Sequence, residues 1–352
     1  MSCFRITLAL LVVLFPITVG AAENHSDPSA PVLLGLAIVL IAAKLGGGLF
    51  ERLSLPPVLG ELIFGALLGN AGLIGLHLFE ELRTDPSMDL LARIGVVVLL
   101  FEVGLESDVK GMLATGLPSL MVAVVGMVAP FLLGYGLGLA LLPEASSDTY
   151  LFIGATLTAT SVGITARVLK DIGQLDRPES RIILAAAVID DVLGLIVLAV
   201  VSGIVTSGVV SGTTVTLIFL KAIGFLVAAI FVGKWVAPYL GRAAMALGSG
   251  SKLAAALVFC FILSYLADSL GLATIVGAFA AGLILEEGHF HPPLRDGSPN
   301  RQTNTPTLHA LTHPFSSILV PVFFVLMGMQ IRLEAFTNLS VLGIAAALTV
   351  VA

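Results

Sequence analysis

Two adjacent carboxylates, Asp190 and Asp191, lie inside an apolar run between Arg181 and Ser202. A run of this length can form a helix that spans a bilayer. At about 1.5 Å per residue, the pair lies roughly 14 Å from Arg181, near the middle of the membrane. An ionised carboxylate there costs at least about 2.5 kcal/mol, and acids at this depth usually belong to ion or proton paths. The sequence therefore predicts a cation- and proton-binding site, in preference to a structural pair neutralised by a lysine or by helix ends.

The segment before the acids contains the residues that we expect to surround them. Gly154–Thr165 is apolar enough to enter a membrane, yet it is dense in glycine, serine and threonine. Such a helix can break inside the bilayer and expose carbonyl groups and helix ends to the acids. Close helix packing by small residues is the alternative. Neighbouring residues on a helix point about 100° apart, so one acid can face a water-filled cavity while the other faces a neighbouring helix.

A second acidic pair lies one helical turn apart at the end of the third apolar segment. Glu102 and Glu106 could form a negatively charged cytoplasmic funnel that attracts cations. An ordinary helix end at the membrane interface explains them equally well. Glu61 and Lys44 are expected near the same interface, where they could reach water or pair with each other.

The composition assigns the chain to the polytopic membrane proteins. Hydrophobic residues make up 57% of the 352 residues and charged residues 11%, and the mean hydropathy is +1.07. Soluble domains contain about a quarter charged residues. The net charge of −6 argues against nucleic-acid binding. No metal motif is present, so no metal is expected beyond a transported cation, and no cofactor is implied.

The apolar segments define the expected topology. Residues 1–22 are typical of a secretory signal, and an uncleaved helix is the alternative. Eleven segments follow, near residues 32–50, 57–76, 91–107, 113–142, 150–170, 182–205, 214–238, 253–267, 272–286, 314–331 and 339–352. Basic residues concentrate in alternate loops, which predicts an external N-terminus. The long polar loop 286–314 would then be cytoplasmic. Its histidines could sense pH, although histidines in solvated loops are more often inert; they are His289, His291, His309 and His313.

Several motifs together resemble the sodium/proton antiporters of the monovalent cation:proton antiporter superfamily, of the cation:proton antiporter-2 type. The resemblance covers most of the chain from about Pro31 onward. It rests on five stretches: Pro57–Gly69, Leu100–Glu106, Thr158–Ser161, Arg181–Gly194 and Pro321–Met329.

This resemblance implies a fold, a function and a set of site residues. The fold would be an all-α inverted-repeat antiporter, in which a core domain moves against a dimerisation domain. Segments four to six would form the first core repeat, with segment seven as the linking helix and the second core repeat incomplete. Asp191 would be the principal ion and proton carrier, with Asp190 beside it. Thr158, Thr160 and Ser161 would lie at the unwound crossing.

The same resemblance favours a homodimer in the inner membrane that exchanges Na⁺ or Li⁺ for H⁺. An acid pair, where some relatives have Gln-Asp, is similar to the electrogenic branch. A potassium efflux system or gated potassium channel on the same scaffold is the alternative. In electrogenic relatives a basic residue follows in a helix that this chain reaches only at its end, and no lysine occurs after Lys252. The sequence is therefore expected to be truncated, and a lysine is expected shortly after Ala352. No nucleophile or phosphate loop accompanies the acids, so a transporter is predicted and not an enzyme.

Overall fold

The computed structural model describes residues 29–74, 78–106, 115–207, 212–247, 251–285, 307–334 and 339–351. Within these ranges all regular structure is helical and no strand is present, which confirms the predicted all-α class. The predicted signal peptide at residues 1–22 lies outside the described residues, as do His289 and His291.

The helices follow the apolar segments closely. Each of the eleven predicted segments contains a helix, and the fifth contains two. In chain order they are α2 (Ser29–Arg52), α3 (Pro57–Gly69), the 3₁₀ turn η1 (Ala71–Ile74), α4 (Leu78–Thr84), α5 (Pro86–Glu106), α7 (Gly116–Leu141), α8 (Ser147–Thr158), α9 (Val162–Asp171), α10 (Pro178–Ser207), α11 (Gly212–Leu247), α12 (Ser251–Ser269), α13 (Thr274–Ile284), α14 (Leu308–Met329) and α15 (Leu339–Val351).

Six stretches of helix in the described part of the chain are long and apolar enough to cross a membrane. They are Ala30–Arg52, Gly116–Leu141, Ser147–Asp171, Thr216–Ala244, Ser251–Ser269 and Leu308–Met329. The helices α3 and α13 are apolar but shorter. Because these spans are distributed over the whole length of the chain, the protein is a multi-pass membrane protein.

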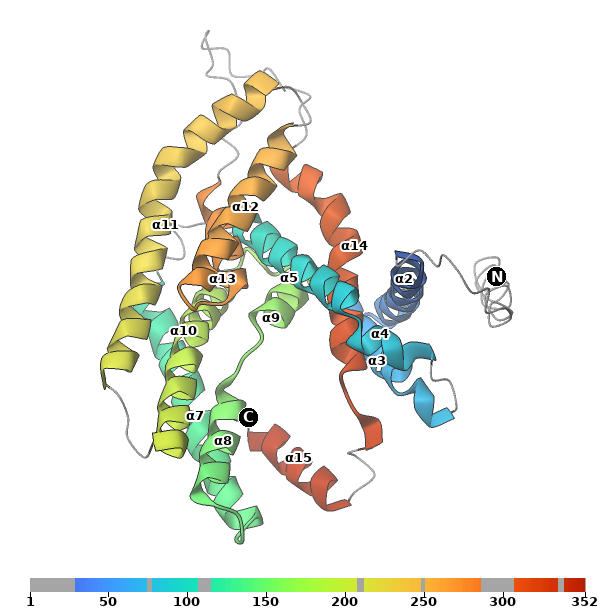
Figure 1. The fold of residues 1–352 in the computed structure, drawn as a ribbon, viewed down its shortest axis with the longest axis vertical. Coiled ribbons are helices and arrows are strands. Elements are labelled where there is room, and N and C mark those ends of the chain that lie inside the picture. Colours follow the sequence, from blue (N-terminus) through green and yellow to red (C-terminus); the bar gives the residue numbers. More distant parts are fainter. Residues whose placement is uncertain are drawn as a thin grey trace.

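One group of helices surrounds α5. The helix α14 packs along α5 and α3, α13 packs on the other side of α5, and α2 packs on α3 (Figure 1). Small residues permit the closest crossing. A Cβ atom on Gly282 of α13 would overlap the carbonyl oxygen of Phe101 on α5, so only glycine fits there. Phe101 and Phe324 are completely buried at the centre of this group.

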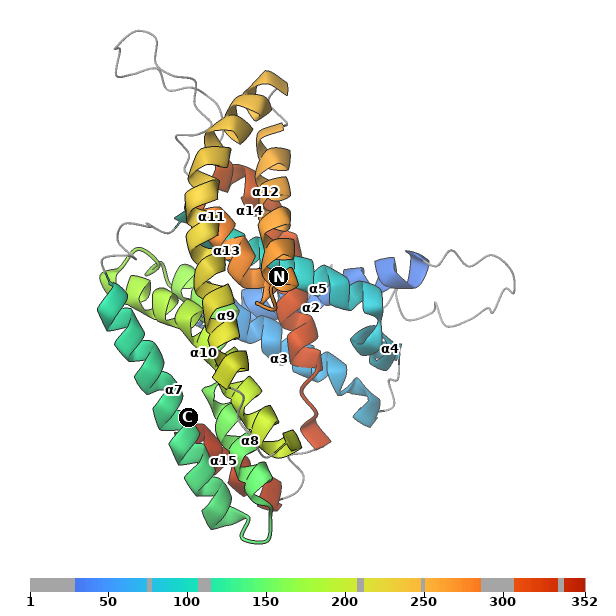
Figure 2. The same cartoon turned by 60° about the vertical axis from the view of Figure 1, so that its left-hand side comes forward.

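A second group consists of α7, α8 and α10. These three helices pack on one another, and α7 and α8 lie away from α2 and α3 in both views (Figures 1 and 2). The helix α15 runs beside α7. The long helix α11 contacts α10 of this group and also contacts α12 and α13. The short helix α9 lies between the groups, because it contacts α10 on one side and α5 and α3 on the other.

Candidate functional site

The transmembrane stretch Ser147–Asp171 is interrupted near its middle. The helix α8 ends at Thr158, and α9 begins at Val162. Between them the backbone is extended, with φ and ψ of −71° and 112° at Ala159 and of −89° and 101° at Ser161. The carbonyl end of α8 and the amide end of α9 therefore meet inside the span, where they present partial charges of opposite sign. The sequence left two interpretations of this segment open, a break or close packing by small residues, and the family resemblance placed an unwound crossing here.

Asp190 faces this break. Its side chain is buried, with the residue only 8% exposed, and its carboxylate accepts hydrogen bonds from the backbone N–H and the hydroxyl of Thr160. Thr160 can donate these bonds because its backbone N–H lies in the extended segment between the two helices. The interruption thus supplies Asp190 with two donors near the middle of the stretch Ser147–Asp171.

Asp191 lies in a different environment from its neighbour. It is half-buried, and among the described residues no hydrogen-bond or ion-pair partner is found for its carboxylate. The two acids follow each other on α10, so their side chains point about 100° apart. Asp190 is consequently bound by Thr160 at the break, whereas the carboxylate oxygens of Asp191 are available for a cation or a proton.

The other two predicted neighbours do not turn toward the acids. The hydroxyl of Thr158 donates to the carbonyl oxygen of Ala155 in its own helix, at 2.8 Å. The hydroxyl of Ser161 accepts from the backbone N–H of Ile164, at 3.3 Å, and so caps the start of α9. Their side chains therefore shape the two helix ends, and only Thr160 reaches an acid.

The far end of α9 contains a set of ion pairs that connects it to other helices. Lys170 Nζ lies 3.0 Å from Glu102 Oε2 and 3.1 Å from Glu106 Oε1, both on α5. Arg167 Nη2 lies 3.8 Å from Oε1 of Glu61 on α3. Glu102 and Glu61 are buried, so both carboxylates depend on these cations for neutralisation.

His309 of α14 completes the same set. Its Nε2 lies 3.3 Å from Glu102 Oε1, and it also contacts Glu106 Oε1. Sequence reasoning treated Glu102 and Glu106 as a possible funnel and did not connect them with Lys170 or His309. Charged residues inside apolar segments indicate that ion pairs must form, because buried charges need partners. The sequence does not show which segments are neighbours, so the partners could not be assigned. In the described part of the chain no ion pair between Lys44 and Glu61 is recorded, although the charge of Lys44 acts on that carboxylate; the amino group of Lys44 donates to Ser317 O at 3.4 Å.

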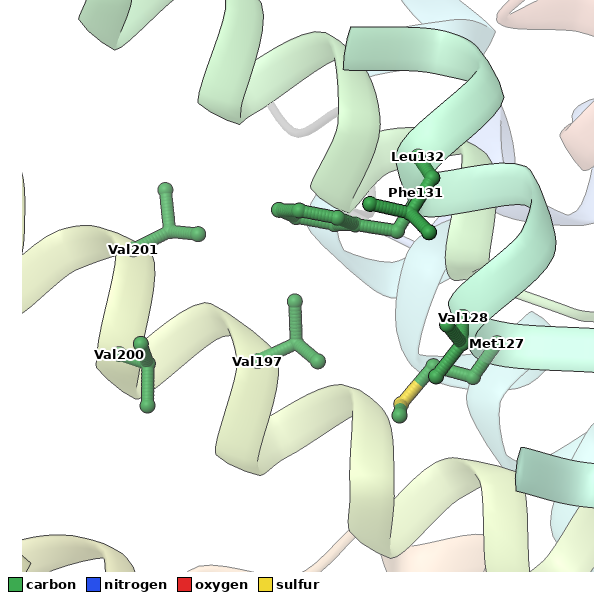
Figure 3. Close-up of a pocket in the computed structure, with 7 residues that line it drawn as sticks. All are labelled: Met127, Val128, Phe131, Leu132, Val197, Val200 and Val201. Carbon is green, nitrogen blue, oxygen red and sulfur yellow. The ribbon is translucent and has the colours of Figure 1, made fainter. Parts of the chain in front are cut away.

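An apolar crevice of about 170 Å³ lies between α7 and α10 (Figure 3). Its lining contains no polar side chain; it consists of Met127, Val128, Phe131 and Leu132 from α7 and Val197, Val200 and Val201 from α10. The close-up shows the two sets of side chains facing each other across the gap. Because it offers a cation no ligand, the crevice is not a candidate ion site, and the acids of α10 remain the candidate.

Comparison with known proteins identifies similar chains. Residues 36–352 match the family described as "Sodium/hydrogen exchanger, transmembrane". The High-affinity Na(+)/H(+) antiporter NhaS3 of Synechocystis is 37% identical over 367 residues, covering 95% of this chain and 75% of that protein. The Na(+)/H(+)-K(+) antiporter GerN of Bacillus cereus is 35% identical over 304 residues, covering 86% of this chain and 72% of that protein.

A solved structure has a similar fold. The sodium proton antiporter MjNhaP1 from Methanocaldococcus jannaschii superimposes with a TM-score of 0.54 and covers 91% of this chain and 78% of that one. The sequences are 17% identical, so this likeness concerns the fold alone.

Proposed function

The chain belongs to the sodium/hydrogen exchanger family, and from this premise we propose that it exchanges Na⁺ or Li⁺ for protons by alternating access. Cation:proton antiport, a secondary transport activity and not an enzymatic one, follows from the family and its sodium/proton antiporter relatives. One observation supports the location of the exchange site. Asp190 and Asp191 lie halfway along α10, and Asp190 binds Thr160 at the break between α8 and α9.

In the proposed mechanism Asp191 binds either a cation or a proton. Its carboxylate loses its proton to one side of the membrane, binds Na⁺ with oxygen ligands, and releases the cation on the other side when a proton returns. The C-terminal carbonyls of α8 supply partial negative charge for the cation. Asp190 stays bound to Thr160 and keeps the break next to the exchanging carboxylate. One Na⁺ for one proton at Asp191 moves no net charge, so electrogenic exchange requires a second proton; in the proposal Asp190 binds it when Na⁺ leaves, and two protons then cross for each Na⁺.

The exchange can be tested in everted membrane vesicles acidified by respiration. Addition of NaCl or LiCl should collapse the pH gradient in vesicles that contain the protein, and should not do so in vesicles without it. A potassium–valinomycin potential should change the rate, because each net charge moved is worth about 2.3 kcal/mol per 100 mV. An exchange rate that is insensitive to the potential would contradict the electrogenic part of the proposal, and no response to either cation would contradict the exchange itself.

Potassium is the second candidate cation. The relative GerN is named as a Na(+)/H(+)-K(+) antiporter, and potassium efflux is also the alternative that the sequence left open. The same vesicles distinguish the two: a collapse of the pH gradient by KCl, without valinomycin and at the concentrations at which NaCl acts, would favour potassium exchange.

We further propose an orientation with the N-terminus outside and the ion pairs of α9 at the cytoplasmic side of the inner membrane. The loop that joins α9 to α10 contains Arg177 and is preceded by Lys170, which the positive-inside rule places in the cytoplasm. In a cysteine-free background, Asp176→Cys should be protected from a membrane-impermeant thiol reagent in intact cells, and Ser207→Cys should react. The reverse pattern would overturn the orientation.

Glu102 and Glu106 on α5 are the residues proposed for a negatively charged cytoplasmic funnel. Glu106 is partly exposed next to the cytoplasmic end, where its charge would raise the local concentration of cations, whereas Glu102 is almost completely buried.

A homodimer is proposed from the family likeness, and the mass of the detergent-solubilised protein measured by light scattering would show one or two copies.

A further inference from the structure

The cluster formed by Glu102, Glu106 and His309 has the composition of a metal site. One atom from each side chain, a carboxylate oxygen or an imidazole nitrogen, lies within 4.8 Å of the others. Glu102 and Glu106 come from α5 and His309 comes from the first turn of α14, so the three ligands converge from two packed helices. This cluster is separate from the acids of α10 and has no part in the proposed exchange step.

The spacing of two of these atoms agrees with a bound ion. Glu102 Oε1 and His309 Nε2 are 3.3 Å apart. Two ligand atoms on a tetrahedral ion with bonds of about 2.1 Å are separated by roughly 3.4 Å. Glu106 Oε1 contacts the same imidazole nitrogen more closely than two ligands of one ion can lie, so these two atoms must move apart for Glu106 to supply a third ligand. The His309 and Glu106 side chains are 42% and 24% exposed, so an ion can reach the cluster from the water.

An independent observation indicates that the cluster needs a further partner. Glu102 Oε1 and His309 Nε2 are both buried, and neither has a hydrogen-bond partner of acceptable geometry in the described residues. The side chain of Glu102 is only 2% exposed, and this unpartnered oxygen points into the cluster. A buried carboxylate oxygen without a hydrogen bond is unfavourable, and a metal ion would satisfy both atoms at once.

Lys170 supplies an ammonium group that contacts both glutamates, and His309 adds a positive charge there only when its imidazole is protonated. The amino group of Lys170 lies 3.0 Å from Glu102 and 3.1 Å from Glu106, and it does not approach within ion-pair distance of the unpartnered oxygen of Glu102. One ammonium group leaves a net charge of −1 on the two carboxylates. A divalent ion in its place would neutralise them fully, so the lysine and the ion compete for the same carboxylates.

We propose that Glu102, Glu106 and His309 form a binding site for a divalent transition-metal ion of the Zn²⁺ class, which competes with Lys170. The imidazole nitrogen favours Zn²⁺ and the similar Co²⁺ over Na⁺, Ca²⁺ and Mg²⁺, which prefer oxygen ligands. Because Lys170 is on α9, occupation of the site by the ion detaches α9 from α5 at this point. The site therefore connects a metal ion in the cytoplasm with the half-helix that borders the break.

The test uses the purified full-length chain in detergent, freed of metal with EDTA and titrated with CoCl₂. Wild type should bind one Co²⁺ per chain, with the visible absorption of a bound ion and a rise in melting temperature. His309→Ala and Glu106→Gln should each weaken binding at least about tenfold, since even changes around a ligand have effects of this size. Lys170→Met should tighten binding, because the competing ammonium is removed. MgCl₂ at equal concentration should not displace Co²⁺.

A matched control is available on the same helix. Asp89 of α5 is exposed and pairs with Arg93, so Asp89→Asn removes a carboxylate without touching the cluster and should bind Co²⁺ as wild type does. Absence of saturable binding to wild type would overturn the proposal, as would equal affinity in wild type and His309→Ala. Weaker binding in a folded Lys170→Met protein would show that the lysine and the ion do not compete. If Lys170→Met does not fold, the His309 and Glu106 variants still decide whether the site exists.

Discussion

Replacement of Asp191 by asparagine is expected to abolish exchange, whereas Asp190→Asn is expected to leave weakened exchange. The difference follows from their surroundings. The carboxylate of Asp190 is held by Thr160, while Asp191 is half-buried with no partner found in the described residues. Asparagine has the shape of aspartate but neither the charge that attracts a cation nor the ability to exchange a proton. The collapse of a respiration-generated pH gradient by NaCl in everted vesicles measures both variants.

The control for this pair is the amount of folded protein in the membrane. Neither asparagine substitution removes a neutralising partner from a buried charge, so both variants should be inserted at the wild-type level and should elute as wild type does after solubilisation. If Asp191→Asn exchanges at the wild-type rate, the exchanging carboxylate has been assigned to the wrong residue. If instead Asp190→Asn is the inactive variant and Asp191→Asn is active, the roles of the two acids are reversed.

The second large effect is expected at Lys170. Lys170→Met, measured in EDTA, should lower the melting temperature strongly, because it leaves the buried carboxylate of Glu102 without a cation. Removal of one partner of a buried ion pair destabilises a protein by about 3–5 kcal/mol. The double variant Lys170→Met, Glu102→Leu should recover most of this loss, since apolar residues of similar volume often replace a buried pair without penalty.

An exposed lysine gives the comparison for this effect. Lys234 lies on the exposed face of α11, and Lys234→Met should change the melting temperature little. Equal melting temperatures for Lys170→Met and Lys234→Met would mean that the pair with Glu102 does not stabilise the fold. A double variant that is less stable than Lys170→Met alone would mean that Glu102 has favourable contacts beyond the lysine.

The sequence predicted the helices and the location of the acids because both depend on local pattern. Apolar runs of about 20 residues correspond to spans, and a pair of aspartates inside such a run is conspicuous whatever surrounds it. The break near Thr160 was one of two interpretations that its threonines, serines and glycines allowed, because small residues also permit close helix packing.

The partners of the charged residues were not predictable from the same pattern. Lys170 is separated from Glu102 by 68 positions and from His309 by 139, and only the packing of α5, α9 and α14 brings the three together. Sequence periodicity shows which face of a helix is apolar but not which helix lies against it. For the same reason Thr158 and Thr160 were treated alike, although they face different groups: Thr158 bonds to its own helix, and Thr160 bonds to Asp190.

The interrupted helix has a mechanical consequence. Its first half packs on α7 and α10, and its second half is attached to α5 and α3 by Lys170 and Arg167. If these two groups of helices rotate against each other, the rotation must be absorbed by a few backbone torsions near Ala159. Those torsions also set the direction of the Thr160 amide and hydroxyl, so a small angular displacement between the two groups changes the donors offered to Asp190. The extended segment between α8 and α9 would therefore both permit the rotation and change the hydrogen bonding of Asp190 when the rotation occurs.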